Sequence, residues 1–293
     1  MKDKKKLLGS FLLLLTAVIW GSSFFIVKNT VDAIAPCWLI AIRFSAAAGI
    51  LALFCLPKLR KMNKKTLTGG LLIGLSLFGA YVAQTYGVAF TTPGKNAFLT
   101  AIYCVLVPFF WWAFTRKRPD GWSFAAAFIC LFGIGLISLD GSISLSLGDG
   151  LSLLSGVLFA LQIALISLYT RDCDPVVLTV LQFAVGGLLA WPCALLLEPV
   201  PSLHAADVWW ALIYLTVVVS ALGMLLQNIG QAMTPSSTAA ILMCLESVFG
   251  VLFSVIFWGE TVTPQALAGF ILVFFAVLVS ETKLSFLRKK RPA

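Results

Sequence analysis

One carboxylate lies deep inside an apolar stretch of this sequence. Glu246 falls near the middle of residues 238–257, which are otherwise free of charged side chains. In a lipid bilayer a charged side chain at such a position costs about 2.5–3.5 kcal/mol on insertion scales. Carboxyl groups retained there commonly bind a polar ligand or take up and release a proton. A structural carboxyl, hydrogen-bonded to a neighbouring helix, is the alternative.

Amide, hydroxyl and aromatic side chains accompany Glu246 in several other apolar stretches. In a binding cavity, aromatic rings supply contact area while amides orient the polar ends of a ligand. We therefore expect these residues to line one cavity together with Glu246, although each could instead join two helices by a hydrogen bond. They are Trp20, Ser23, Tyr81, Gln84, Tyr103, Gln162, Gln227 and Asn228.

Three further residues are assigned structural or gating roles. Arg43 lies within residues 38–56 and could bind an anionic group. Its counterpart in the internal repeat described below is Gln182, which favours a structural role such as hydrogen bonding to carbonyl groups at a helix junction. Pro108 lies within residues 97–114, and Glu260 lies in the turn before the last apolar stretch.

The composition requires a membrane environment. Of the 293 residues, 60% are hydrophobic and only 11% are charged, whereas about a quarter of the residues of a soluble domain are charged. A transmembrane helix needs about 20 predominantly apolar residues, and ten stretches of the chain approach or exceed this length. They are residues 7–27, 38–56, 66–89, 97–114, 122–139, 149–169, 176–196, 207–231, 238–257 and 264–284.

The sequence also repeats itself. Residues 84–91 read QTYGVAFT and residues 227–234 read QNIGQAMT, an offset of 143 that also pairs Tyr103 with Glu246. We expect two copies of one five-helix unit, residues 1–140 and 141–293. Because five is odd, the second copy enters the bilayer upside down. The predicted fold is therefore an all-α integral membrane protein with ten transmembrane helices in two inverted five-helix repeats, an architecture of secondary transporters.

Basic residues collect on one side of this topology. Of the 21 Lys and Arg residues, all but Lys28, Arg43 and Lys95 fall on the side of the two termini. The positive-inside rule then places both termini in the cytoplasm, and we expect a bacterial inner membrane. The net charge of +9 thus reflects topology and contact with anionic lipid head groups, and no nucleic-acid partner is expected.

Enzyme chemistry finds no support in the residues. His204 is the only histidine, so neither a His-based triad nor a multi-histidine metal site can form, and nucleotide-binding glycine motifs are absent. The seven cysteines contain no CxxC pair and are expected to act as small apolar packing residues. We expect no enzymatic activity, no metal and no cofactor.

Several short motifs follow one another in order along the chain. They are Ala17–Phe24 (AVIWGSSF), Arg43–Phe44, Phe98–Leu99 with Pro108, Gly148–Gly150, and Leu245–Phe249 running to Trp258–Glu260. Together they resemble the drug/metabolite transporter superfamily, specifically its EamA-type branch, over almost the whole chain. The resemblance implies ten helices in two inverted repeats, a central cavity, and movement of small metabolites such as amino acids, often outward.

The resemblance also carries expectations for single residues. It implies that Trp20 lies near the cavity and that Gly21 allows close approach or a local bend. Ser247 stands where the family commonly has proline after the glutamate, so a kink expected there should be weaker or absent.

The leading hypothesis is an alternating-access carrier that exports a small substrate, an amino acid or related amphiphilic compound, with proton coupling through Glu246 left open. An uncoupled facilitator or importer is the alternative within transport. A non-transporting membrane component, such as a lipid scramblase or a sensor, is the alternative from another class. The sequence leaves the oligomeric state open.

Overall fold

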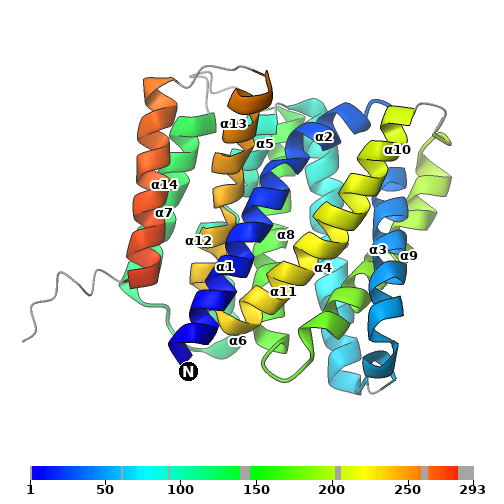
Figure 1. Ribbon diagram of the computed structural model, residues 1–293, viewed down its shortest axis with the longest axis horizontal. Helices are drawn as coiled ribbons and strands as arrows, with labels where there is room; N and C mark the ends of the chain where they lie inside the picture. Colours follow the sequence, from blue (N-terminus) through cyan, green and yellow to red (C-terminus); the bar gives the residue numbers. More distant parts are fainter. Residues whose placement is uncertain are drawn as a thin grey trace, which may run out of the picture.

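The computed structural model describes residues 2–60, 62–91, 93–138, 146–201, 206–258 and 263–282, and the secondary structure within them is entirely helical (Figure 1). In chain order the elements are α1 (Lys2–Gly21), α2 (Ser23–Thr30), α3 (Pro36–Leu59), α4 (Lys64–Phe90), α5 (Pro93–Thr100), α6 (Tyr103–Thr115), α7 (Gly121–Ser138), α8 (Leu147–Tyr169), α9 (Pro175–Leu197), α10 (Ala206–Ile213), the π-helix η1 (Tyr214–Leu222), α11 (Gly223–Met233), α12 (Ser236–Met243), α13 (Leu245–Trp258) and α14 (Pro264–Thr282).

Seven segments of the described chain are long and apolar enough to cross a membrane. They are Lys4–Thr30, Pro36–Leu59, Lys64–Phe90, Asn96–Thr115, Leu147–Tyr169, Pro175–Leu197 and Val208–Met233. Three shorter apolar helical segments coincide with the other three predicted stretches: Gly121–Leu136, Ser236–Gly250 and Leu267–Val279. The chain is thus an all-helical integral membrane protein.

Several predicted membrane helices are divided into shorter elements. The first is divided at Ser22 into α1 and α2, the fourth at Ala101 and Ile102 into α5 and α6, and the ninth at Cys244 into α12 and α13. The eighth contains the nine-residue π-helix η1. Hydropathy reports the length of an apolar stretch but not its local backbone hydrogen bonding, so these interruptions have no signal in composition.

The ninth helix is interrupted close to Ser247. The lack of proline at that position predicted a weak or absent kink, yet the helix is interrupted three residues earlier, at Cys244. There the Ser247 N–H donates to the Cys244 carbonyl at 3.2 Å, a spacing of three residues that tightens the backbone turn. A helix can therefore be interrupted at this point without proline.

Helices in the two parts of the chain begin at the same sequence offsets as the repeated motifs. α5 and α12 begin 143 residues apart, at Pro93 and Ser236, and also end 143 residues apart. α3 and α9 each begin with a proline, 139 residues apart. In Figure 1, α5 lies above α6 whereas α12 lies below α13, so these two interrupted helices run in opposite directions.

Glycines allow two pairs of helices to touch backbone to backbone. A Cβ on Gly148 of α8 would lie 2.8 Å from the Gly87 carbonyl oxygen of α4, and a Cβ on Gly9 of α1 would lie 3.0 Å from the Gly230 carbonyl oxygen of α11. Gly9 and Gly148 are 139 residues apart, and Gly87 and Gly230 are 143 apart. Close approach of this kind stabilises helix pairs in lipid, where the hydrophobic effect does not drive them together.

At one end of the molecule, the carboxylate of Glu198, the residue that follows α9, caps the N-terminus of α3. Ala35, the N-cap residue of α3, makes no side-chain cap hydrogen bond. The backbone N–H groups of Cys37 and Trp38 instead donate to Glu198 at 2.9–3.1 Å, and the Tyr86 hydroxyl donates to the same carboxylate. An acid at a helix N-terminus satisfies free N–H groups and complements the helix dipole.

At the opposite end, two ion pairs join the same parts of the chain. Lys58 of α3 pairs with Asp174 at 2.9 Å, and Lys65 of α4 pairs with Asp172. The hydrogen bond from Lys65 lowers the pKa of Asp172. Polar contacts thus join α3 and α4 to the residues that flank α9, at both ends of these helices.

Candidate central binding cavity

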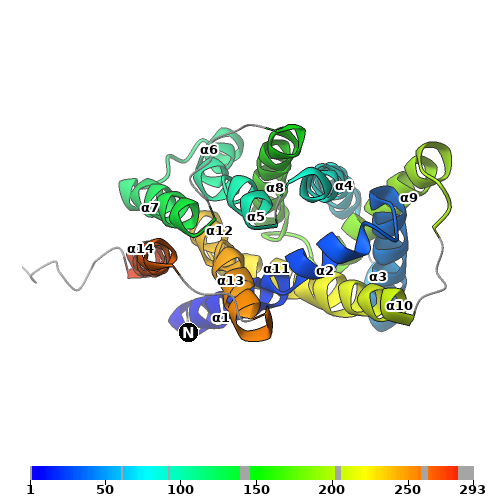
Figure 2. The same ribbon diagram turned by 90° about the horizontal axis from the view of Figure 1, so that it is seen from above.

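A cavity lies between two rows of helices. Seen from above, α4, α5 and α8 form one side, and α1, α2, α11 and α13 form the other (Figure 2). The space inside it, open solvent at its mouth included, amounts to about 670 Å³. Its lining includes seven of the residues proposed as cavity residues from the sequence: Trp20, Ser23, Tyr81, Gln84, Tyr103, Gln227 and Glu246. Arg43, which was assigned a structural or gating role, also lines it.

Glu246 and Tyr103 are in direct contact in this cavity. Tyr103 is the first residue of α6 and Glu246 the second of α13, so each follows an interruption of its helix. The Tyr103 hydroxyl donates to Glu246 Oε1 at 3.2 Å, and both side chains are buried. Tyr103 and Glu246, which occupy equivalent positions in the sequence repeat, are therefore neighbours in space.

Arg43 extends from α3 into the cavity wall and is 1% exposed. Its Nε and Nη2 atoms donate to Ser220 Oγ at 3.2 and 3.0 Å. The guanidinium carbon lies 5.5 Å from the centroid of the Tyr81 ring. The Ser220 hydroxyl thus accepts from Arg43, in place of the helix-end carbonyls that the sequence analysis suggested.

The π-helix η1 positions two of the lining side chains. Ser220 holds Arg43, and the neighbouring carbonyl of Val219 accepts a hydrogen bond from Trp20 Nε1 at 3.2 Å. A π-helical turn departs from the regular i to i−4 pattern, which makes carbonyls available to other donors, and such turns are frequent at functional sites. Gly223 follows η1 and leaves room for the ring, since a Cβ there would lie 2.7 Å from Trp20 Nε1.

Gly21 brings α1 against the residues around Glu246. A Cβ on Gly21 would lie 2.7 Å from the Glu246 carbonyl oxygen and 2.6 Å from Phe249 Cβ. α1 also ends at this glycine. Gly21 is thus a point of close approach, and α1 ends there.

Gln162 and Asn228 were predicted to line the cavity but lie in a buried amide network beside it. Gln227 Nε2 donates to Gln162 Oε1 at 3.5 Å, and Gln162 Nε2 donates to Gln182 Oε1 at 3.4 Å. Asn228 Nδ2 donates to Thr179 Oγ1 at 2.8 Å. Gln162 and Asn228 thus belong to this network and not to the cavity lining.

The remaining predicted residues lie elsewhere. Pro108 is buried within α6 and is not part of the cavity lining, and Glu260 lies outside the described residues. The lining also contains residues that were not among the candidates: Phe24, Val27, Thr85, Val88, Asn96, Phe159 and Ile163. Most are apolar, and an apolar residue in an apolar stretch gives no sequence signal that it faces a cavity.

Asn96 is the most polar of these additional residues. Its Nδ2 donates to Ser152 Oγ at 2.7 Å and to the Gln84 carbonyl at 3.3 Å. Its Oδ1, like Gln227 Oε1, is buried and has no hydrogen-bond partner among the described residues. Both acceptors line the cavity and could take hydrogen bonds from a ligand.

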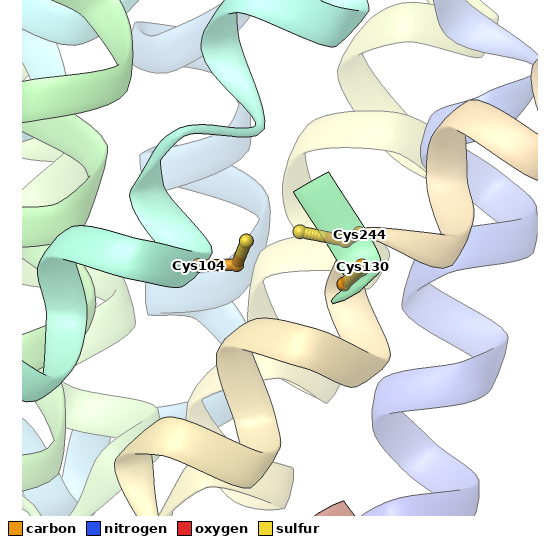
Figure 3. Close-up of side chains that lie close together, drawn as sticks. All are labelled: Cys104, Cys130 and Cys244. Carbon is orange, nitrogen blue, oxygen red and sulfur yellow. The ribbon is translucent and has the colours of Figure 1, made fainter. Parts of the chain in front are cut away.

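Three of the seven cysteines gather close to this cavity (Figure 3). The sulfur atoms of Cys104, Cys130 and Cys244 lie within 4.8 Å of one another, and all three residues are buried. A metal ion that prefers sulfur ligands would need deprotonated cysteines at a spacing like this one. The Cys104 thiol donates to the Ala127 carbonyl and the Cys244 thiol to the Ala101 carbonyl.

Comparison with known proteins covers almost the entire chain. The sequence pattern of the EamA-like transporter family matches residues 7–139 and again residues 146–282. An uncharacterized transporter of Archaeoglobus fulgidus is 32% identical over 280 residues, which is 94% of this chain and 86% of that protein. A probable biotin transporter of Pseudomonas aeruginosa is 27% identical over 256 residues, covering 85% and 88% of the two chains.

The fold is also found in a solved structure. One crystal structure superposes with a TM-score of 0.80 over 98% of this chain and 99% of that chain, at 16% sequence identity. This likeness concerns the fold alone. The family pattern matches both parts of the sequence, and the Archaeoglobus relative is named as a transporter. Both findings agree with the helical membrane architecture. The chain belongs to the EamA-like transporter family.

Proposed function

We propose that this membrane transporter is an alternating-access carrier and that the central cavity is its substrate site. The observation that carries the proposal is the lining: a carboxyl, a guanidinium, amides and aromatic rings from both parts of the chain surround one space. Such a mixture suits a small amphiphilic metabolite, an amino acid or a related compound. A relative named as a probable biotin transporter makes biotin a further member of this class to test.

The carrier is built from two inverted five-helix repeats, residues 1–140 and 141–293, with ten membrane helices. Support comes from equal element bounds at the 143 offset, from the equivalent glycine crossings, and from the opposite directions of α5–α6 and α12–α13. Tyr103 and Glu246 occupy equivalent positions and touch, as expected for residues beside a pseudo-twofold axis. Inverted repeats allow one site to open alternately to either side.

The cavity is proposed to open toward the end of the molecule remote from the N-terminus. Residues of α2 at its mouth, Ser23, Phe24 and Val27, are half-buried, whereas Tyr103, Gln227 and Glu246 are buried. Figure 1 places α2 at the end opposite the N-terminus. With both termini in the cytoplasm of a bacterial cell, this conformation faces outward, and the network around Gln227, Gln162 and Gln182 closes the inner side.

Protons are proposed as the coupling ion, with Glu246 as the group that carries them. The charged and titratable groups around its carboxyl are Tyr103, which donates to it, Arg43 and Tyr81 of the same cavity, and the nearby thiol of Cys244. Binding a proton in one orientation of the repeats and releasing it in the other would link proton movement to export. An uncoupled facilitator or importer would share the same cavity but would move cargo down its own gradient alone.

Uptake by purified protein in liposomes tests this function. The panel contains labelled amino acids, biotin and other small metabolites, with and without a pH gradient. Saturable uptake of one class, lost in Glu246→Ala, is expected. The matched control is Gly150→Ala, since a Cβ at Gly150 meets nothing within 4 Å and should leave uptake unchanged.

Two results would refute the proposal. Uptake that persists unchanged in Glu246→Ala would show that the cavity is not part of the transport path. Absence of uptake for every solute, together with bidirectional lipid exchange by the folded protein, would favour a scramblase.

A further inference from the structure

Arg43 carries a buried charge that the described chain does not neutralise. The side chain is 1% exposed and lines the cavity, yet no carboxylate among the described residues lies within 4.0 Å of its guanidinium. Glu246 shares the cavity, but its carboxyl accepts a hydrogen bond from Tyr103. A charge removed from water without a partner costs several kcal/mol, so the site favours binding of an anion.

The contacts of Arg43 orient the guanidinium without supplying negative charge. Ser220 Oγ accepts from Nε and Nη2, and the Tyr81 ring lies 5.5 Å from the guanidinium carbon. A guanidinium has five N–H donors in a planar fork, so donors remain beyond the two that Ser220 engages. Arg43 is therefore held in place with hydrogen-bonding capacity left for a ligand.

We propose that Arg43 binds the carboxylate of the cargo, which makes the cargo an amphiphilic monocarboxylate. This assignment rests on the proposed carrier function. A planar carboxylate matches the guanidinium fork and can accept two parallel hydrogen bonds. One guanidinium balances one negative charge, whereas a phosphate dianion would leave a charge uncompensated within the cavity.

The rest of the lining fits the apolar part of such a cargo. Trp20, Phe24 and Phe159 supply aromatic contact area, and Val27 and Val88 add aliphatic surface. The free acceptors Asn96 Oδ1 and Gln227 Oε1 can receive hydrogen bonds from N–H or O–H groups elsewhere on the cargo. The proposed substrate class is therefore defined by two features: a carboxylate that binds Arg43 and an apolar part that packs against these rings.

Ligand-induced stabilisation of the purified protein in detergent tests the assignment. Hexanoate, phenylacetate and phenylalanine are each compared with the corresponding primary amide. We expect at least one acid to raise the melting temperature at concentrations about tenfold or more below those its amide requires, because the charge-assisted pair is lost in the amide. If no acid stabilises the protein more than its amide, the proposal is refuted.

Arg43→Gln should abolish this preference for the acid, and Arg43→Lys should retain part of it because the charge remains. The matched control is Arg171→Gln, which removes an exposed arginine over the Trp111 ring and away from the cavity. Without ligand, Arg43→Gln is expected to melt at the same or a higher temperature, because an unpaired buried charge has been removed. A large loss of stability with acid preference retained would instead assign Arg43 a structural role.

Uptake in liposomes separates failure of this inference from failure of the carrier proposal. A neutral cargo transported equally by wild type and Arg43→Gln would preserve the carrier and refute the carboxylate anchor. Absence of uptake for all solutes would refute the carrier itself.

Discussion

Single residues at the centre of the cavity determine how transport should respond to pH. Glu246→Gln keeps an oxygen that accepts from Tyr103 but cannot bind and release a proton. Uptake by this variant is therefore expected to be independent of pH across the neutral range, whereas wild-type uptake varies with it. Initial rates in liposomes at several pH values measure the effect. A Glu246→Gln profile that follows the wild-type profile would exclude Glu246 as the proton carrier.

Tyr103→Phe is the matching change on the other side of this hydrogen bond. The ring and its packing remain, while the hydroxyl that donates to Glu246 is removed. The pH profile of uptake is expected to change, because the carboxyl proposed to carry the proton loses its hydrogen-bond partner. A profile unchanged from wild type would show that this contact does not tune Glu246.

At this scale, sequence reasoning was most successful for polar residues inside apolar stretches. Glu246, Tyr103 and Gln227 reach the cavity because polar groups in lipid-facing positions are costly and therefore turn inward. Gln162 and Asn228 also turn inward, but toward other helices, and the sequence contains no signal that separates these two environments. Ser220 was missed because a single serine in an apolar stretch is common.

At the scale of elements, the cap that Glu198 provides to α3 is expected to contribute to stability. Glu198→Ala removes the acceptor for the N–H groups of Cys37 and Trp38 and should lower the free energy of unfolding by about 1–2 kcal/mol. Thermal unfolding in detergent measures this loss. Asp172→Ala, which removes the carboxylate of an exposed ion pair, is the control and should change little. Equal effects of the two changes would contradict the capping role.

The lowered pKa of Asp172 gives this ion pair a defined pH response. A carboxyl whose pKa is lower in the folded than in the unfolded state stabilises the fold above its ordinary pKa and loses that contribution as the pH falls through the folded value. Any stabilisation by the Lys65–Asp172 pair should thus disappear under acidic conditions. Wild type and Asp172→Ala should melt at more similar temperatures at acidic than at neutral pH.

The contact between α4 and α8 gives a second test at this scale. In Gly148→Ala the new Cβ would lie 2.7 Å from Phe90 C and 2.8 Å from Gly87 O, both backbone atoms. Because the helices must separate, a loss of about 1–3 kcal/mol is expected. Gly150→Ala, in the same helix with open space around it, is expected to be neutral or slightly stabilising. Similar melting temperatures for both variants would contradict the close crossing.

Elements show where sequence-based prediction of the fold reaches its limit. The apolar stretches coincide with the observed helical segments because lipid demands long runs of hydrophobic residues. The interruptions at Ala101 and Cys244 and the π-helix η1 depend on hydrogen bonds and contacts between distant helices. Neither length nor hydropathy carries that information, although the equal offset of the two interruptions is implicit in the repeat.

For the molecule as a whole, the proposed inverted repeat predicts that equivalent loops lie on opposite sides of the membrane. Cysteines introduced at Lys117, which is exposed, and at Glu260, its equivalent 143 positions later in the sequence, should react with a membrane-impermeant maleimide from opposite sides. Labelling of intact cells and of inverted vesicles, in a background lacking the seven native cysteines, measures this. Labelling of both sites from the same side would contradict the inversion.

The central claim, a carrier that exposes one cavity alternately to each side, is tested most directly by counterflow. Liposomes containing wild-type protein are loaded with unlabelled cargo, and entry of trace labelled cargo is followed beside empty liposomes and the Glu246→Ala variant. Alternating access predicts saturable entry that internal cargo accelerates in wild type and in Gly150→Ala, and that is lost in Glu246→Ala. Entry that neither saturates nor responds to internal cargo, or that persists in Glu246→Ala, would contradict the claim.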